Sequence, residues 1–368
     1  MEKIKTKKRY QYQSDVLLAP GPTMTPDWVW NAMRSSPIHH RTKAYRALAQ
    51  ELAERMRILF DAKESIVLFL SGAGTDMMER AVASITEAKT RISIINTGFF
   101  SDRWNTIAHR YSRHVSPCIA PWGQTYSLPD VKKNFSSHMP DLVLMQATET
   151  STGVKNDPLP VSRALRAVSP HALFAVDAVL EAGVSPLNMD KNGIDIIFGA
   201  SQKALMLPPG LGFIIFGKRA LQKIKPSQTS FVFDVSDEIL FAKNTSSRYT
   251  PPMSHMAGLR AVLRFIMEDM GEETWYRGHT QRAQREREFF ASLGFGMFPH
   301  VASSGMSVLT MPERKGSVAF SDHMEETEHF VISPGLGKEA DTVIRIAHFA
   351  GISERDWKRF HTITKKMF

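Results

Sequence analysis

The stretch Gly199-Ala200-Ser201-Gln202-Lys203-Ala204-Leu205 places a lysine shortly after an apolar run that is typical of a strand. Twenty-six residues before that lysine, the apolar run Phe174-Ala175-Val176 closes on Asp177. A lysine amine can hold the aldehyde of pyridoxal phosphate as a Schiff base, and a carboxylate at a strand end can keep the pyridine nitrogen of that cofactor protonated. Single lysines are mostly solvated and strand-end aspartates often belong to turns, so the prediction depends on the pair. Together the two residues predict a site for pyridoxal phosphate.

Short β-rich apolar runs alternate with longer amphipathic stretches around these motifs. Strands are predicted over residues 66–70, 92–95, 142–145 and 173–176, and helices over 77–88, 103–113 and 161–168. Strands separated by helices imply crossover connections and a mainly parallel sheet. Residues 194–198 and 213–216 flank Lys203 without a long helix between them, which favours an antiparallel edge pair. The predicted fold is therefore α/β, with a mainly parallel mixed sheet between helices.

The chain divides near residue 260. After Pro251-Pro252, helical patterns cover about residues 254–270 and 273–292, and shorter mixed elements follow to the C-terminus. We expect a basic N-terminal arm over residues 1–15 and a large cofactor-binding domain over 16–260, whose N-terminal segment contributes to the substrate cleft. A smaller C-terminal α+β domain is expected over residues 261–368.

The composition is that of a folded protein. Of 368 residues, 43% are hydrophobic and 23% are charged, which suits two domains with a sizeable core. No apolar stretch is long enough to span a bilayer, and the N-terminus lacks the apolar segment of a secretory signal, so we expect a cytoplasmic protein without membrane contact. The single cysteine, Cys118, excludes an internal disulfide framework and a multi-thiolate site, and we expect no metal.

The chain has 46 Lys and Arg residues against 37 Asp and Glu, which gives a formal net charge of +9. Beyond the first nine residues, the basic side chains alternate with acids along predicted helices, as in the run at residues 282–288. Such a pattern is typical of a solvated helix face with local ion pairs. We therefore expect small anionic ligands rather than nucleic acid as partners.

A glycine-rich turn, Ser71-Gly72-Ala73-Gly74-Thr75-Asp76, lies between the first predicted strand and the first long helix. Glycines let the backbone approach a ligand closely, and the amides at a helix N-terminus favour an anion. The turn could therefore seat a phosphate, although many such turns are only tight connections. It lacks the full dinucleotide fingerprint and the lysine of a P-loop, which argues against a nicotinamide enzyme or a nucleotide hydrolase.

Two further segments carry candidate groups. Glu149-Thr150-Ser151-Thr152-Gly153-Val154 follows the predicted strand at 142–145, so its polar groups emerge at the same sheet edge as Asp177. Arg345 interrupts the apolar run of residues 342–348. A guanidinium in that place can clamp a substrate carboxylate with two hydrogen bonds, or can pair with a structural acid.

These residues resemble the class V aminotransferases of pyridoxal phosphate fold type I, especially the alanine–glyoxylate and serine–glyoxylate (serine–pyruvate) type. The resemblance covers most of the chain. It includes Ala19-Pro20-Gly21-Pro22-Thr23 and His40-Arg41, and it is strongest at residues 201–205 with Pro208-Pro209-Gly210-Leu211-Gly212. Where relatives have small residues after the Asp177 segment, this chain has Leu180-Glu181, a difference that bears on the substrate more than on the cofactor.

The resemblance implies a role for each matching residue. Lys203 resembles the Schiff-base lysine and Asp177 the partner of the pyridine nitrogen, while Arg345 matches the arginine that receives the substrate carboxylate. Pro20 and Gly21 would line the substrate cleft. The remaining cofactor-binding residues that the resemblance implies are Gly72, Ala73, Gly74, Thr75, Phe100 (stacking on the ring), Thr150, Val179, Gln202 (near the phosphate) and Thr250.

The implied activity is a ping-pong transamination from a small amino acid, alanine or serine, to a 2-oxo acid such as glyoxylate or pyruvate. Thr250 matches a position that reaches the phosphate of a neighbouring subunit, which implies a homodimer with shared active sites. Alternatives remain open: a 2-aminoethylphosphonate–pyruvate-type or other amine-donor aminotransferase, and a scaffold or binding protein that keeps the fold without turnover. A cysteine desulfurase is disfavoured, because Cys118 lies well before the lysine.

Overall fold

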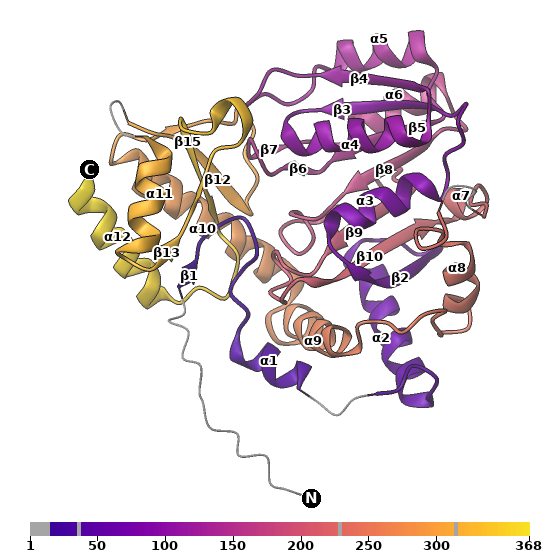
Figure 1. The fold of residues 1–368 in the computed structure, drawn as a ribbon, viewed down its shortest axis with the longest axis horizontal. Coiled ribbons are helices and arrows are strands. Elements are labelled where there is room, and N and C mark those ends of the chain that lie inside the picture. The colour runs from indigo at the N-terminus through magenta and orange to yellow at the C-terminus, as the bar shows by residue number, and fades with distance from the viewer. Residues whose placement is uncertain (1–14, 35–37, 227–229, 313–315) are drawn as a thin grey trace, which may run out of the picture.

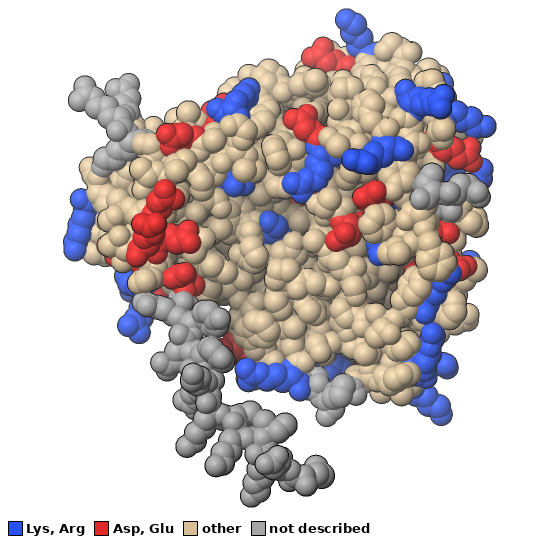
Figure 2. All heavy atoms as spheres, in the orientation of Figure 1, with Lys and Arg blue, Asp and Glu red and all other residues tan. Residues whose placement is uncertain are grey.

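The computed structural model describes residues 15–34, 38–226, 230–312 and 316–368. The expected N-terminal arm over residues 1–15 lies outside the described residues, except for Asp15. None of the helices within these ranges is long and apolar enough to cross a membrane. On the face drawn in Figure 2, basic and acidic side chains are interspersed among uncharged surface.

A seven-stranded sheet forms the centre of the molecule, with strand order β2-β10-β9-β8-β5-β3-β4. Its strands are β2 (Ser65–Gly72), β3 (Arg91–Asn96), β4 (His114–Ile119), β5 (Leu142–Gln146), β8 (Leu173–Asp177), β9 (Ile196–Ala200) and β10 (Gly210–Gly217). Strands β4, β3, β5, β8 and β9 pair in parallel, whereas β10 is antiparallel to both of its neighbours. All strands except β10 therefore end at the same edge of the sheet.

Both faces of this sheet are covered by helices, because successive residues of its central strands are apolar (Figure 1). One face packs Val143, Phe174 and Ile197 under α2, α5, α6 and α9. The opposite face packs Leu144 and Phe198 under α3, α4 and α8. These helices are α2 (Lys43–Leu59), α3 (Gly74–Ala83), α4 (Phe99–Tyr111), α5 (Leu128–His138), α6 (Pro158–Val168), α8 (Ser236–Ala242) and α9 (Met253–Arg264).

A second, four-stranded sheet lies beside the large one, in the order β11-β12-β15-β14 (Figure 1). Its strands are β11 (Gly296–Met297), β12 (Met306–Thr310), β14 (Ser333–Pro334) and β15 (Val343–Ala347), and α10 (Glu272–Ala291), α11 (Ser317–Glu326) and α12 (Glu354–Met367) pack around it. The N-terminal strand β1 (Val16–Leu17) pairs in parallel with β13 (Phe330–Val331). The start of the described chain thus lies against elements from its C-terminal third.

The remaining elements are short. They are α1 (Asp27–Met33), α7 (Lys218–Leu221), the strand pair β6 (Thr148–Glu149) and β7 (Val154–Lys155), the π-helical turn η1 (Phe265–Met270) and the 3₁₀ turn η2 (Gly337–Glu339). The pair β6–β7 follows directly from β5, so it carries polar residues to the edge where the parallel strands end.

The mixed, mainly parallel sheet between helices is confirmed, and three details differ from the prediction. The first long helix ends at Ala83 rather than near residue 88, because the chain turns through residues 84–90 into β3. The helix expected over 254–270 becomes π-helical from Phe265. The expected antiparallel edge pair is wrong in position: β10 is antiparallel, but β2 pairs along its outer side, so β2 is the edge strand.

Candidate active site

Lys203 lies in the loop between β9 and β10, at the edge where the parallel strands end. Its Nζ donates a hydrogen bond to the carbonyl of Pro20. Gly21, with a φ of +102°, lies against the lysine so closely that a Cβ there would come within 2.5 Å of Nζ. The structure therefore brings the N-terminal segment at residues 20–21 onto Lys203, and only glycine leaves room for the amine.

Burial changes the acid–base properties of Lys203. Its pKa falls to about 8, mainly because burial disfavours the charged ammonium and also because the Arg345 charge repels it, while the Asp177 carboxylate acts in the opposite direction. A substantial fraction of this amine is neutral near physiological pH, which an exposed lysine is not. A neutral amine is the form that can attack an aldehyde or take up a proton.

Asp177 is the last residue of β8 and is 8% exposed. Its Oδ1 accepts the amide hydrogen of Val179 at 2.7 Å. Burial raises the pKa of the carboxyl to about 7, and the nearby Glu149 charge adds to the rise, whereas the Val179 amide and the charges of Lys203 and Arg103 lower it. A buried carboxyl of this kind is stabilised as an anion by a cationic partner, such as a protonated ring nitrogen.

Arg345 reaches the same place from the second sheet. It lies in the middle of β15, between Val308 of β12 and Ser333 of β14, and is 9% exposed. Its Nε donates to the carbonyl of Pro334 at 2.9 Å. Burial lowers the pKa of the guanidinium to about 10, an effect that the Glu149 charge opposes, so Arg345 stays cationic at neutral pH.

The glycine-rich turn connects β2 to α3. Gly72 ends β2, Ala73 precedes the helix, and Gly74 and Thr75 are its first residues. A Cβ on Gly74 would come within 2.7 Å of Val179 Cγ2, so the turn packs directly on the segment that follows Asp177. The hydroxyl of Thr75 accepts a hydrogen bond from Arg103 Nη1 at 2.8 Å. The first turn of α3 thus presents backbone amides, a hydroxyl and a nearby guanidinium to the sheet edge.

The other predicted residues are distributed as follows. Phe100 is the second residue of α4, and the guanidinium of Arg103 lies 4.8 Å from the centre of its ring. Thr150 follows β6 and is almost fully buried. The side-chain Oε1 of Gln202 is buried with no hydrogen-bond partner among the described residues. Thr250 is exposed on the loop before α9, and no hydrogen bond within the described residues joins it to Lys203.

These groups fit pyridoxal phosphate. The site offers a buried amine whose lowered pKa increases its neutral fraction, a buried carboxyl, an aromatic side chain and a helix N-terminus for a phosphate. The close approach of the Gly21 backbone to the Lys203 amine, which a Cβ would fill, supports the fit.

Two residues were missed as functional candidates by the sequence reasoning. The sequence places Glu149 only in a polar turn, yet its carboxylate accepts hydrogen bonds from two amides at the start of α4. Arg103 bonds to Thr75 and lies over Phe100. Phe100 and Arg103 share a face of α4, but the predicted helix began only at residue 103, so their spacing did not indicate this contact.

Leu180 and Glu181, where this chain differs from the expected pattern, join the two sheets. Leu180 packs in an apolar cluster with Val308 of β12 and with Phe349. The buried carboxylate of Glu181 accepts hydrogen bonds from Thr148 at 2.6 Å and from Ser303 at 3.1 Å. These contacts give both residues a structural role between the large sheet and the loop that precedes β12.

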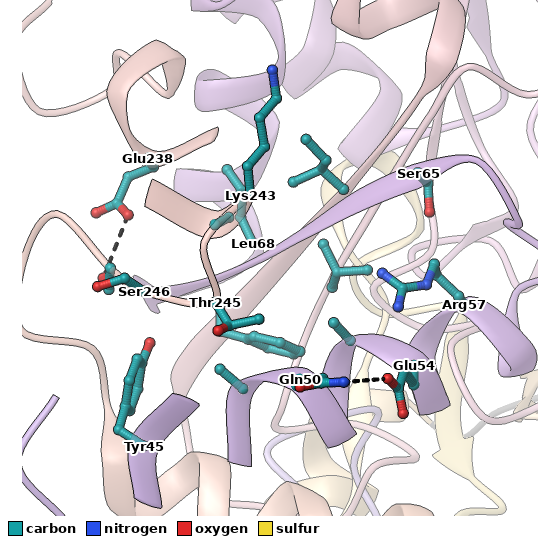
Figure 3. Close-up of a pocket in the computed structure, with 17 residues that line it drawn as sticks. Tyr45, Gln50, Glu54, Arg57, Ser65, Leu68, Glu238, Lys243, Thr245 and Ser246 are labelled. Atoms are coloured by element: carbon teal, nitrogen blue, oxygen red, sulfur yellow. Dashed lines mark hydrogen bonds between the residues drawn. The ribbon is translucent and has the colours of Figure 1, made fainter. Parts of the chain in front are cut away.

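A separate hollow of about 390 Å³ lies between α2, the outer edge of β2 and α8 (Figure 3). Tyr45, Arg57, Ser65 and Glu238 are among its lining residues, and Gln50 bonds to Glu54 along one wall at 3.0 Å. Lys203, Asp177 and Arg345 do not line it. This hollow is therefore distinct from the site at the sheet edge.

Known proteins resemble this chain over nearly its whole length. The sequence model of the family described as Aminotransferase class-V matches residues 17–317. An L-aspartate–glyoxylate aminotransferase of Paracoccus denitrificans is 28% identical over 345 residues, covering 92% of this chain and 87% of the relative. An alanine–glyoxylate aminotransferase of Oryctolagus cuniculus is 28% identical over 341 residues, covering 90% and 86%. The crystal structure of an aspartate aminotransferase of subgroup IV from Thermus thermophilus superposes with a TM-score of 0.88 at 26% identity, covering 96% of this chain and 100% of that one.

Proposed function

The chain belongs to the class V aminotransferases, and from this premise we propose that it transfers an amino group from alanine or serine to a 2-oxo acid such as glyoxylate or pyruvate. The enzyme is a pyridoxal phosphate-dependent aminotransferase. The observation that carries the proposal is the grouping of the buried Lys203 amine with Asp177 and Arg345, whose charges both shift its pKa.

Lys203 is the proposed catalytic residue. Pyridoxal phosphate, when bound, supplies an electron-withdrawing ring that makes the α-hydrogen of an attached amino acid acidic. The Lys203 amine would hold the cofactor aldehyde and would move the α-proton of the substrate as a base and acid. Both tasks require a neutral amine, which its lowered pKa of about 8 supports.

The residues around Lys203 hold the two ends of the cofactor and the substrate. Asp177 would keep a proton on the ring nitrogen, and Phe100 would stack on the ring. The turn formed by Gly72, Ala73, Gly74 and Thr75 would bind the phosphate together with Gln202. Thr150 would form a hydrogen bond to the cofactor, and Val179 would also contribute to its binding. Arg345 binds the substrate carboxylate with its fork of N–H donors, and Pro20 and Gly21 close the cleft.

The names of the relatives support glyoxylate as the amino acceptor. The Paracoccus denitrificans and Oryctolagus cuniculus proteins are both named for glyoxylate, whereas the donors in their names, L-aspartate and alanine, differ. A common acceptor and a variable donor are expected if the same cleft binds a short oxo acid in each protein. The donor therefore has to be measured for this chain.

A homodimer with shared active sites is also proposed. Large apolar side chains are exposed on and beside α8, close to the loop that carries Thr250: Phe231, Val232, Leu240, Phe241 and Tyr249, with Phe231 69% exposed. An apolar patch of this kind is typical of a protein interface. Burying it against a second copy would let Thr250 reach the phosphate of the neighbouring subunit.

The domain boundary near residue 260 and a cytoplasmic location complete the proposal. The boundary is supported by the two separate sheets, whose strands lie within residues 65–217 and 296–347. The single cysteine, Cys118, suits a reducing compartment.

The donor is identified by converting the bound cofactor without an oxo acid. The protein is loaded with pyridoxal phosphate and mixed separately with alanine, serine, aspartate and 2-aminoethylphosphonate, and the absorbance change to the pyridoxamine form is recorded. We expect alanine or serine to convert the cofactor. Conversion by 2-aminoethylphosphonate alone would favour the alternative donor class, and a protein that binds no cofactor would favour a scaffold.

The rate at which pyridoxal phosphate attaches covalently to the protein should follow the lowered pKa of Lys203. At pH 7 about a tenth of this amine is neutral, against about one in three thousand for a lysine with its ordinary pKa. We therefore expect the rate to rise about tenfold from pH 6 to pH 7 and to level off above about pH 8. Borohydride trapping at timed intervals measures it.

Free Nα-acetyl-lysine is the matched reference for that experiment. Its attachment rate should keep rising towards pH 10.5, because only its ordinary pKa governs the neutral fraction. A protein rate that rises in parallel with the reference up to pH 10 would contradict a buried, perturbed Lys203.

A further inference from the structure

Glu149 is a fully buried carboxylate within the candidate site, with 0% of its surface exposed. It ends the short strand β6, directly before Thr150, and pairs with Val154 of β7. A buried carboxylate is costly unless hydrogen-bond donors surround it. The donors around Glu149 therefore indicate what the charge stabilises.

Five donors converge on the Glu149 side chain. Oε1 accepts the Phe100 amide at 3.1 Å, the Ser151 amide at 3.1 Å and the Ser151 hydroxyl at 2.7 Å. Oε2 accepts the amide of Ser101 at 2.9 Å, and the Ser101 hydroxyl lies 2.9 Å from Oε2 and 2.8 Å from Gln146 Oε1, so these two acceptors share its single proton. An ionised carboxylate is the side-chain group that accepts on all sides and donates on none. The arrangement thus suits a side chain that only accepts hydrogen bonds.

The two amides from Phe100 and Ser101 belong to the first turn of α4. Helix N-termini have unpaired amides, which a residue at the cap position normally satisfies. Here the cap residue is Gly98, which has no side chain, and a Cβ there would come within 2.5 Å of the Ser151 hydroxyl and 2.7 Å of Glu149 Cγ. A carboxylate about fifty residues further along the chain therefore caps α4 from outside, and its negative charge also complements the helix dipole.

This cap joins the side chains proposed to contact the cofactor ring. Phe100 is held through its own amide, and Thr150 lies between Glu149 and Ser151, which are bonded to each other. One turn further along α4, Arg103 lies over the Phe100 ring and donates to Thr75 in the phosphate turn. A displacement of the first turn of α4 would thus move groups on both sides of the cofactor.

We propose that Glu149 is a positioning residue for cofactor binding: its buried carboxylate caps α4 and thereby fixes the Phe100 ring and Thr150 against the cofactor. This inference rests on the proposed function of the site. It adds the residue that holds the start of α4 in place beside the cofactor. The charge of Glu149 also contributes to the rise of the Asp177 pKa. The negative charge of Glu149 would therefore add to that of Asp177 in favouring a cationic ring nitrogen.

Glu149→Gln is the discriminating substitution. The amide keeps the size of the carboxylate but replaces one of its two acceptor oxygens with an NH₂ donor. If the NH₂ group replaces Oε1 it faces the amides of Phe100 and Ser151, and if it replaces Oε2 it faces the amide of Ser101. Either orientation sets a donor against a donor. We expect pyridoxal phosphate to bind roughly tenfold to a hundredfold more weakly in equilibrium dialysis, with a reduced visible circular dichroism of the bound cofactor.

Glu286→Gln is the matched control. Glu286 is also 0% exposed, but it lies on α10, where Arg285 and His361 bond to it. Its substitution should lower the thermal midpoint and leave cofactor affinity and circular dichroism unchanged. The inference is overturned if Glu149→Gln binds the cofactor as the unsubstituted protein does, or if both variants lose affinity in proportion to their loss of stability.

Ser151→Ala keeps the test decisive if Glu149→Gln does not fold. It removes the hydroxyl donor to Oε1 and keeps the Ser151 amide, so a several-fold weaker affinity is expected and an unchanged affinity would overturn the inference. Failure of the unsubstituted protein to bind pyridoxal phosphate would contradict the proposed function itself, and is thereby distinguished from a failure of the Glu149 inference.

Discussion

Replacing Lys203 with alanine is expected to abolish transamination, lowering kcat by about 10⁴-fold or more. The substitution removes the buried amine that we propose both to hold the cofactor aldehyde and to move the α-proton. The neighbouring Arg345 remains cationic, and Asp177 is the group that we propose to pair with the ring nitrogen, so neither is available to replace the amine. Single-turnover conversion of the cofactor by the best donor measures the loss.

The covalent attachment of the cofactor separates this result from a folding defect. After borohydride reduction, the mass of the unsubstituted chain should increase by one cofactor, and that of Lys203→Ala should not. Lys218→Ala is the control, because Lys218 is exposed and pairs with Glu64 on the surface. Wild-type turnover in Lys203→Ala, with far-ultraviolet circular dichroism unchanged, would contradict the assignment.

The large sheet could be predicted from the sequence because its strands are short apolar runs between amphipathic stretches. The residues of β8, for example, are buried on both faces, which leaves a continuous apolar run rather than an alternating one. Asp177 at the end of that run and Lys203 after the next one then mark the edge where ligands bind. The pattern of apolar runs therefore predicted the fold class, and the positions of Asp177 and Lys203 at the ends of these runs predicted the edge of the sheet that carries the site.

Contacts between distant segments could not be predicted in the same way. The position of β10 between β9 and β2 depends on which strands pair, and an apolar run does not encode its neighbour. Glu149 bonds to amides at residues 100 and 101, which no spacing along the chain indicates. Gly21 lies against Lys203 although 182 positions separate them, and only the resemblance to a family suggested that segment.

The second large effect is expected at Arg345, the group that we propose to bind the substrate carboxylate. Arg345→Gln should lower kcat/KM for alanine by roughly 10²- to 10³-fold, because a charge-assisted, two-point contact becomes a neutral one. Arg345→Lys should recover little of this loss, since an ammonium lacks the planar fork. Steady-state kinetics at saturating glyoxylate give both values.

Arg287→Gln is the control for Arg345, because Arg287 is also a partly buried arginine near the second sheet, bonded to Ser307 and to the carbonyl of Met306. Its loss should reduce stability more than kcat/KM. The decisive comparison is between alanine and an amine that carries no acid group, such as alaninamide. If Arg345 binds the carboxylate, its replacement should lower kcat/KM for alanine much more than for the second donor. The second donor has no such contact to lose. An equal loss for both donors would mean that Arg345 acts through the charge it exerts on Lys203, and the carboxylate would then have to be bound by another group.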